Sequence, residues 1–183
     1  CIESLCGDVT LDNSNLRYDG DDAAVTVNAG RFNMTDTNLI ARTQASALDV
    51  NHASLYVSNS RIASTYNGIR GDLVGDSRLI GVTVIQLGDW QGFERGENAR
   101  AVDVNLTTKA SIITVDQMKT LFYGNGLYLS GVGEGLISNS LFYSDHAVNS
   151  ELQRVRILNN YIFADEIGID IENGTAYVGD NHI

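Results

Sequence analysis

The stretch Gly168–Ile183, which reads GIDIENGTAYVGDNHI, contains two short strand signals joined by a turn signal. GIDI alternates apolar and polar residues, as a half-buried strand does, and Asn-Gly is a dipeptide typical of turns. The final VGDNHI places a polar Asn between two branched aliphatic residues. The stretch therefore predicts a strand, a turn and a second strand.

The same template recurs along the chain. A small residue that opens an apolar-x-apolar strand occurs at Ala24, Ala47, Gly68, Ala101, Gly126, Ala147 and Gly168. A polar residue inside an apolar-x-x-polar-x-apolar segment occurs at Ser14, Thr37, Ser60, Ser77, Asp116, Asn139, Asn160 and Asn181. Because most repeats are about 21 to 23 residues apart and rich in β-branched residues, the pattern indicates a solenoid with one repeat per coil.

A right-handed parallel β-helix fits this period best, since a six-residue repeat is absent and crossovers between parallel strands are right-handed. We expect about eight coils in an all-β single domain, residues 1–183, with residues 1–7 as an N-terminal cap. Residues 80–100 are expected to form a loop insertion in the fourth coil. Since the last coil leaves backbone groups unpaired, we expect a fragment of a longer solenoid, or end-to-end or homo-oligomeric association.

Composition limits the partners. The chain has 18 Gly, no Pro and a formal net charge of -11, so no nucleic-acid partner is expected, because nucleic acid needs a basic surface. No apolar run approaches the length of a membrane-spanning helix, and no membrane insertion of this segment is expected. Cys1 and Cys6, the only cysteines, predict a small end-cap disulfide, with free thiols as the alternative. Such a disulfide favours a secreted or cell-surface location.

The alternation within each strand predicts which side chains point outward. A first outward column is expected at Thr26, Asp49, Arg70, Asp103, Tyr128, Asn149 and Asp170, and a second at Asn28, Asn51, Asp72, Asn105, Ser130, Glu151 and Glu172. An aliphatic core stack is expected at Val25, Leu48, Ile69, Val102, Leu127, Val148 and Ile169. The outward columns are polar throughout, as in sugar-binding surfaces.

The fourth coil breaks the regular spacing. After Ser77 the chain takes 24 residues to return instead of 8 to 10, and the extra residues include the 88–100 loop with the only Trp, Trp90. Long loops on a rigid scaffold usually form binding sites. The candidate ligand-binding residues are therefore Asp49, Arg70, Asp72, Trp90, Asp103, Asn105 and Tyr128.

The order of strand, Asn-type turn, strand, variable loop and GIxL strand resembles the pectin-lyase-like right-handed β-helix superfamily. In style, the segment AVTVNAGRFNMTDTNLIA followed by ALDVNHASLYVSNSRIA is similar to the passenger repeats of pertactin-type autotransporter adhesins. The resemblance implies a bacterial surface protein, exposed at the outer membrane and associated with virulence. The polar face and the 88–100 loop would then bind glycan or a host surface protein. Arg70-Gly71-Asp72 spells an integrin-type tripeptide, but it falls in an expected strand rather than in a loop.

The alternative is a polysaccharide-acting enzyme: a lyase, an inverting glycoside hydrolase, an epimerase or a phage tailspike. Its catalytic residues would be Asp49, Arg70, Asp72 and Asp103, since carboxylates separated by about 6.5 to 9.5 Å suit inversion. In a lyase the carboxylates would hold Ca²⁺ while Arg70 takes the proton. Apart from that Ca²⁺, no cofactor or metal is expected. A solvated acidic face without catalysis is the simpler interpretation of the same residues.

Overall fold

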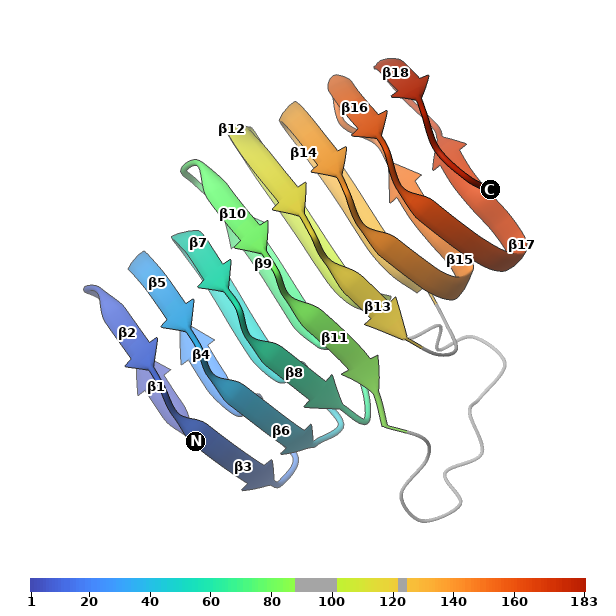
Figure 1. Ribbon diagram of the computed structural model, residues 1–183. Coiled ribbons are helices and arrows are strands. Elements are labelled where there is room, and N and C mark those ends of the chain that lie inside the picture. The colour runs from blue at the N-terminus through green and yellow to red at the C-terminus, as the bar shows by residue number, and fades with distance from the viewer. Residues whose placement is uncertain (88–101, 122–124) are drawn as a thin grey trace.

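In the computed structural model, the chain forms a parallel β-solenoid that winds as a right-handed β-helix of about seven turns (Figure 1). The structure describes residues 1–87, 102–121 and 125–183, apart from the side chains of residues 102, 103 and 110. All secondary structure in these ranges is strand. The fold predicted from the repeat is thus confirmed.

Each coil crosses three parallel sheets, which we call faces 1, 2 and 3. Face 1 contains β1 (Ile2–Ser4), β4 (Val25–Val27), the first half of β7 (Leu48–Ser58), β9 (Ile69–Leu73), the first halves of β12 (Val102–Asp116) and β14 (Asn125–Ser138), and the second halves of β15 (Leu141–Ser150) and β17 (Tyr161–Ile171). Face 2 contains β2 (Val9–Asp12), β5 (Gly30–Thr35), β10 (Ser77–Ile80), β16 (Arg154–Leu158), β18 (Thr175–Gly179) and the second halves of β7, β12 and β14. Face 3 contains β3 (Asn15–Asp19), β6 (Asn38–Arg42), β8 (Arg61–Ser64), β11 (Thr83–Gln86), β13 (Lys119–Leu121) and the first halves of β15 and β17.

Equivalent residues of successive coils stack in register, and the inward ones form one continuous core. On face 1 the inward stack is Val25, Leu48, Ile69, Val104, Leu127, Val148 and Ile169. All are buried except Ile169 in the last coil, which is half-buried. The predicted stack is correct except at the fifth coil, where Val104 replaces Val102. Alternation has a period of two, so a shift of two residues preserves the pattern and is invisible in the sequence.

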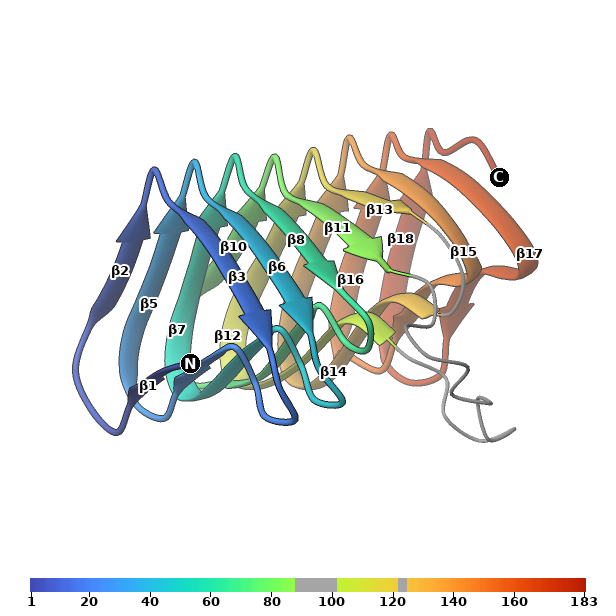
Figure 2. The same ribbon diagram turned by 90° about the horizontal axis from the view of Figure 1, so that it is seen from below.

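The corner between faces 2 and 3 repeats in every coil and lies along one edge of the molecule (Figure 2). It begins with a residue of positive φ, at Asn13, Asp36, Asn59, Gly81, Gln117, Asn139, Asn159 and Asp180. Asn and Asp tolerate this left-handed conformation better than most residues. The side chain after each one forms a second column: Ser14, Thr37, Ser60, Val82, Met118, Ser140, Asn160 and Asn181. We call this column the corner ladder.

The polar side chains of the corner ladder accept hydrogen bonds from backbone N–H groups of the preceding coil. Ser14 N–H donates to Thr37 Oγ1 at 3.3 Å, and Thr37 N–H donates to Ser60 Oγ at 3.1 Å. In later coils Ser140 N–H donates to Asn160 Oδ1 and Asn160 N–H to Asn181 Oδ1, both at 2.9 Å. The ladder residues are therefore part of the scaffold.

Three predicted ladder positions were wrong. Ser77 instead begins β10, Asp116 ends β12, and Asn139 is the positive-φ residue before Ser140. In two of these coils the corner ladder position is apolar: it is Val82 in one and Met118 in the other, and both are fully buried. A template that requires a polar residue cannot find an apolar corner, so it matched polar residues nearby.

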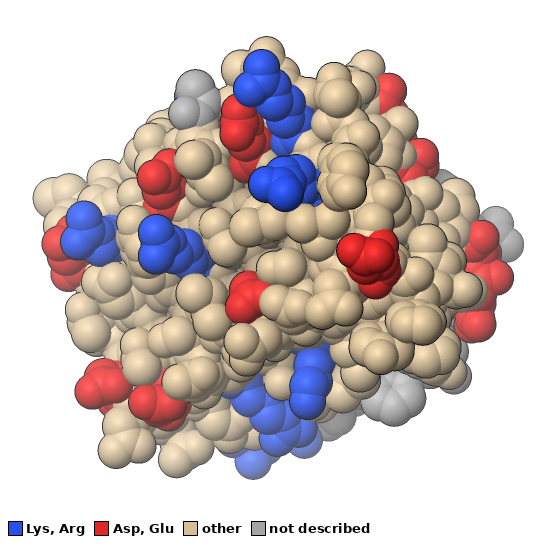
Figure 3. Space-filling view, turned by 45° about the horizontal axis from the view of Figure 1, so that its top comes forward, with Lys and Arg blue, Asp and Glu red and all other residues tan. Residues whose placement is uncertain are grey.

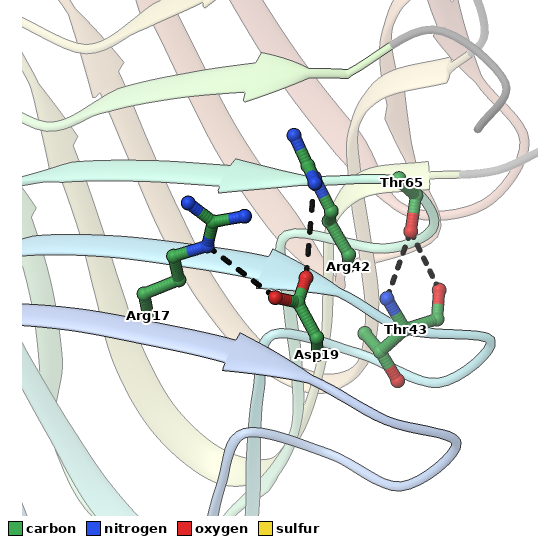
Figure 4. A network of polar contacts seen from close by, with 5 residues as sticks. All are labelled: Arg17, Asp19, Arg42, Thr43 and Thr65. Carbon is green, nitrogen blue, oxygen red and sulfur yellow. Dashed lines mark hydrogen bonds and ion pairs between the residues drawn. The ribbon is translucent and has the colours of Figure 1, made fainter.

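The corner between faces 3 and 1 is closed in the first coils by side-chain contacts (Figure 4). Thr65 Oγ1 donates to Thr43 O at 2.7 Å and accepts from Thr43 N–H at 2.9 Å. Asp19 lies 3.3 Å from Arg17 Nε and 3.9 Å from Arg42 Nε. The fourth coil reaches this corner after β11, where the 88–101 segment lies outside the described residues.

The first and last coils have partly uncovered apolar residues. Ile183 is 76% exposed and Leu5 is 74% exposed. β1 pairs in register with β4, so residues 2–4 belong to the first coil of face 1. Association of these ends with another layer stays a prediction.

Cys1 and Cys6 are both exposed and free, so the expected disulfide is absent from the structure. The extended strand β1 lies between the two residues and separates them, since a strand rises about 3.3 Å per residue.

Candidate functional site

The outward side of face 1 carries two polar columns in register. The first is Glu3, Thr26, Asp49, Arg70, Asn105, Tyr128, Asn149 and Asp170, and the second runs through Asn51, Asp72, Thr107 and Ser130. Asn105, not Asp103, therefore follows Arg70 in the first column, and the predicted register of this strand was wrong by two residues. Asp103 belongs to β12, and its side chain lies outside the described part of the chain.

Asp49 is half-buried in β7, next to the exposed Arg70 of β9. Burial removes water from the carboxylate and raises the pKa of Asp49, while the Arg70 charge and a hydrogen bond with Asn51 act in the opposite direction. Its Oδ1 atom is buried and has no hydrogen-bond partner. Buried polar atoms in folded proteins are nearly always paired, so this oxygen is an exception on face 1.

Asp72 gathers two basic side chains around one carboxylate oxygen. Lys109 Nζ lies 2.8 Å and His52 Nε2 lies 3.5 Å from Asp72 Oδ2. The other oxygen, Oδ1, is buried and unpaired. His52 has a φ of 53°, a conformation that residues with a side chain rarely adopt.

The contacts of Asp72 with Lys109 and His52 were not predicted from the sequence. Lys109 is 37 residues from Asp72 in the chain, and the wrong register on β12 hid their proximity. His52 is exposed, and nothing in its local sequence indicates that its ring lies 3.5 Å from Asp72 Oδ2. The site is thus more basic in its middle coils than the sequence suggested.

Tyr128 marks the C-terminal part of the columns. Its hydroxyl donates a short hydrogen bond to Glu151 Oε1, and this bond raises the pKa of Tyr128 to about 12, with burial and the charge of Glu172 adding to the effect. Asn149, the next residue of the column, has a buried Oδ1 without a partner. The hydroxyl groups of Thr107 and Ser130 lie 2.9 Å apart on the second column.

The structure brings five of the predicted ligand residues together on one face: Asp49, Arg70, Asp72, Asn105 and Tyr128. Trp90 and the rest of the 88–100 loop lie outside the described residues. Arg70 and Asp72 point outward from β9 while Gly71 is buried, so the Arg-Gly-Asp tripeptide is inside a strand, as expected.

The described residues contain neither a cluster of metal-binding side chains nor a membrane-spanning helix. Within residues 1–87, 102–121 and 125–183, no three His, Cys, Asp or Glu side chains gather as a metal site. None of the elements in these ranges is a helix long and apolar enough to cross a membrane.

The chain matches no protein-family model, no curated protein and no solved structure. The function is therefore inferred from the geometry of face 1.

Proposed function

We propose that the outward side of face 1 binds a glycan chain, which lies along the solenoid axis across β7, β9, β12, β14 and β15. The observation that carries this proposal is the register of the two outward polar columns, which place a polar side chain of face 1 on each successive coil. The carboxylates of Asp49 and Asp72 accept hydrogen bonds, Arg70 donates them, and the amides of Asn105 and Asn149 can do both. A ligand that follows these columns must present donors and acceptors in a row, as the hydroxyl and ring oxygens of a sugar chain do.

The surrounding residues fit the same class of ligand. Arg70 and Lys109 supply charged donors for ring or glycosidic oxygens, and Tyr128 offers an aromatic edge beside them. Since the strands are about 4.8 Å apart, equivalent side chains form a regular row of contacts that a linear polymer can follow. Binding along such a row would make affinity grow with the length of the glycan.

In this proposal the protein is an extracellular or cell-surface bacterial β-helix that acts as an adhesin. The sugars, or the glycans of a host surface protein, would be its target. A rigid solenoid with a long polar face suits attachment, because the binding row needs no conformational change. This role follows the resemblance to autotransporter passenger repeats.

A glycan array tests the proposal with three proteins: the wild type, the double variant Asp49→Ala/Asn149→Ala, and the control Asp12→Ala/Asn33→Ala. The control removes the same two side-chain types from the outward side of face 2. We expect the face 1 variant to lose at least about tenfold in affinity, since hydrogen bonds to charged groups contribute about 1.5 to 3 kcal/mol. The control should bind like the wild type. Binding that survives in the face 1 variant, or no glycan bound by the wild type, contradicts the proposal.

A second candidate, a glycoside hydrolase, is favoured by the different environments of Asp49 and Asp72. Burial raises the pKa of Asp49, which suits a general acid, whereas Asp72 contacts Lys109 and His52 and suits a general base. Asp72 is on the next coil and two residues further along, a diagonal separation of about 7 to 8 Å in a sheet. That separation lies in the range for inverting enzymes.

The two candidates differ in product formation. Reducing ends and absorbance at about 235 nm should be followed on every bound glycan, because the second signal reports the unsaturated product of a lyase. New reducing ends without absorbance at about 235 nm, lost in both Asp49→Asn and Asp72→Asn, make the protein a hydrolase. Binding without product, in wild type and variants alike, leaves a binding protein.

A further inference from the structure

Face 2 carries arginine side chains that have no acidic partner. Arg31 on β5, Arg78 on β10 and Arg156 on β16 are all exposed. Among the described residues, none of the three has a carboxylate oxygen within 4.0 Å. Figure 3 looks toward the side of face 2 and shows blue Lys and Arg side chains interspersed with red acidic ones on a mostly uncharged surface. Unpaired arginines are unexpected in a chain with 23 acidic and 12 basic residues.

Carboxylates are present near this face, but each has one oxygen in contact with another group. Asp8 Oδ1 accepts from the backbone N–H of Arg31 at 3.0 Å, and Asp76 Oδ1 accepts from the backbone N–H of Ile112 at 3.1 Å. Glu134 is paired with Arg154 at 3.0 Å. None of these three carboxylates lies within 4.0 Å of the Arg31 or Arg78 guanidinium, so both side chains can meet an external anion.

Tyr56 lies beside both arginines. Arg31 Cζ lies 5.6 Å from the centre of the Tyr56 ring, in a cation–π contact. Arg78 is the direct cross-strand neighbour of Tyr56, on the following coil. We call Arg31, Tyr56 and Arg78 the arginine cluster; it spans three successive strands, β5, β7 and β10.

We propose that the arginine cluster is a second binding surface, separate from face 1, and that it binds a short acidic polypeptide segment. Arg and Tyr are the residue types that carry most binding energy in protein interfaces, and Arg pairs with carboxylates through two parallel hydrogen bonds. The ring contact restrains Arg31 before binding, which lowers the entropy lost on association. The partner is a short segment because the net charge of -11 repels a large acidic protein, whereas screening confines the local attraction to about 8 to 10 Å.

A labelled peptide of ten Glu residues tests the inference by fluorescence anisotropy at low and at moderate salt, with a peptide of ten Gln residues as the uncharged comparison. The test variant is Arg31→Gln/Arg78→Gln, and Tyr56→Leu probes the ring. The matched control is Arg17→Gln/Arg61→Gln, which removes two exposed arginines of face 3. Circular dichroism and urea midpoints verify that each variant is folded.

We expect the Glu peptide to bind the wild type, and the Arg31→Gln/Arg78→Gln variant to bind it at least tenfold more weakly. The control should change affinity less than twofold, and salt should weaken binding. No preference for Glu over Gln, or an equal loss in the face 3 control, overturns the inference. So does dextran sulfate that binds the wild type as tightly as the Glu peptide and is lost to the same extent in the test variant, since it shows that the cluster attracts polyanions in general. Glycan binding on face 1 is measured separately and does not enter these outcomes.

Discussion

The corner ladder and the outward columns of face 1 are both rows of polar side chains with one member per coil, yet they differ in how they are satisfied. Asn160 in the ladder is fully buried, and its side chain bonds Ser140 N, Ile137 O and Asn181 Oδ1. Asp49 and Asn149 on face 1 keep a buried oxygen without a partner. A satisfied row stabilises the fold, whereas the outward row of face 1 contributes less to stability and, in our proposal, faces the ligand. The two rows should therefore respond in opposite ways to substitution.

The largest effect is expected from Asn160→Ala. The change leaves the buried Ser140 N–H without its partner and removes one donor from the Ile137 carbonyl, and an unsatisfied buried group costs about 1 to 3 kcal/mol. Urea unfolding should show a lower free energy of unfolding, while glycan binding by the folded protein is unchanged. The face 1 change Asn149→Ala is the comparison. If Asn149→Ala lowers the free energy of unfolding as much as Asn160→Ala does, the two rows contribute equally to stability and the contrast between them is wrong.

A smaller effect of opposite sign is expected from Val82→Thr. Val82 is a buried ladder position that offers no acceptor to the Ser60 N–H of the preceding coil. Thr has nearly the same shape and restores a hydroxyl there, and a net hydrogen bond contributes about 0.5 to 1.5 kcal/mol. We expect a higher urea midpoint with an unchanged slope. A lower midpoint would mean that desolvation of the hydroxyl outweighs the new bond.

The smallest effect is expected from Asp49→Asn, and it depends on pH. Because the folded-state pKa of Asp49 is raised above its ordinary value of 3.8, the folded protein holds this proton more tightly than the unfolded chain. The stability that Asp49 contributes is fully present below pH 3.8 and is lost as the pH rises through the raised pKa. Asn cannot ionise, so Asp49→Asn should be slightly more stable than wild type at neutral pH and equal to it at low pH.

Unfolding midpoints across the acid range check this expectation. Asp12→Asn, at an exposed residue of β2, controls for the loss of one negative charge. A wild type that is more stable than Asp49→Asn at neutral pH would show that Asp49 is a scaffold residue, like the corner ladder.

Much of the fold was present in the sequence because each coil repeats the same local signals. Strands such as Gly126–Ser130 and Ala147–Ser150 alternate with a period of two, and positive-φ Asn residues mark the corners. Stacking equivalent residues then predicted most of the face 1 columns, including the pairing of Asp49 with Arg70. A polar face built from these residues was therefore predictable.

Other features depend on contacts between coils that the sequence pattern does not encode. The strand after the insertion could shift by two residues without changing its alternation, and this shift placed Asn105 beside Arg70 and Lys109 beside Asp72. The corner ladder passes through Val82 and Met118 because an apolar side chain fills the same space in the core.

The sequence by itself determined the architecture and the polarity of each face, since local alternation decides which side chains are buried. Only the tertiary structure decided which oxygens on face 1 lack partners and which arginines on face 2 lack carboxylates. Satisfaction of a polar group depends on neighbours one coil away, about 20 residues or more along the chain, and therefore on the register between strands.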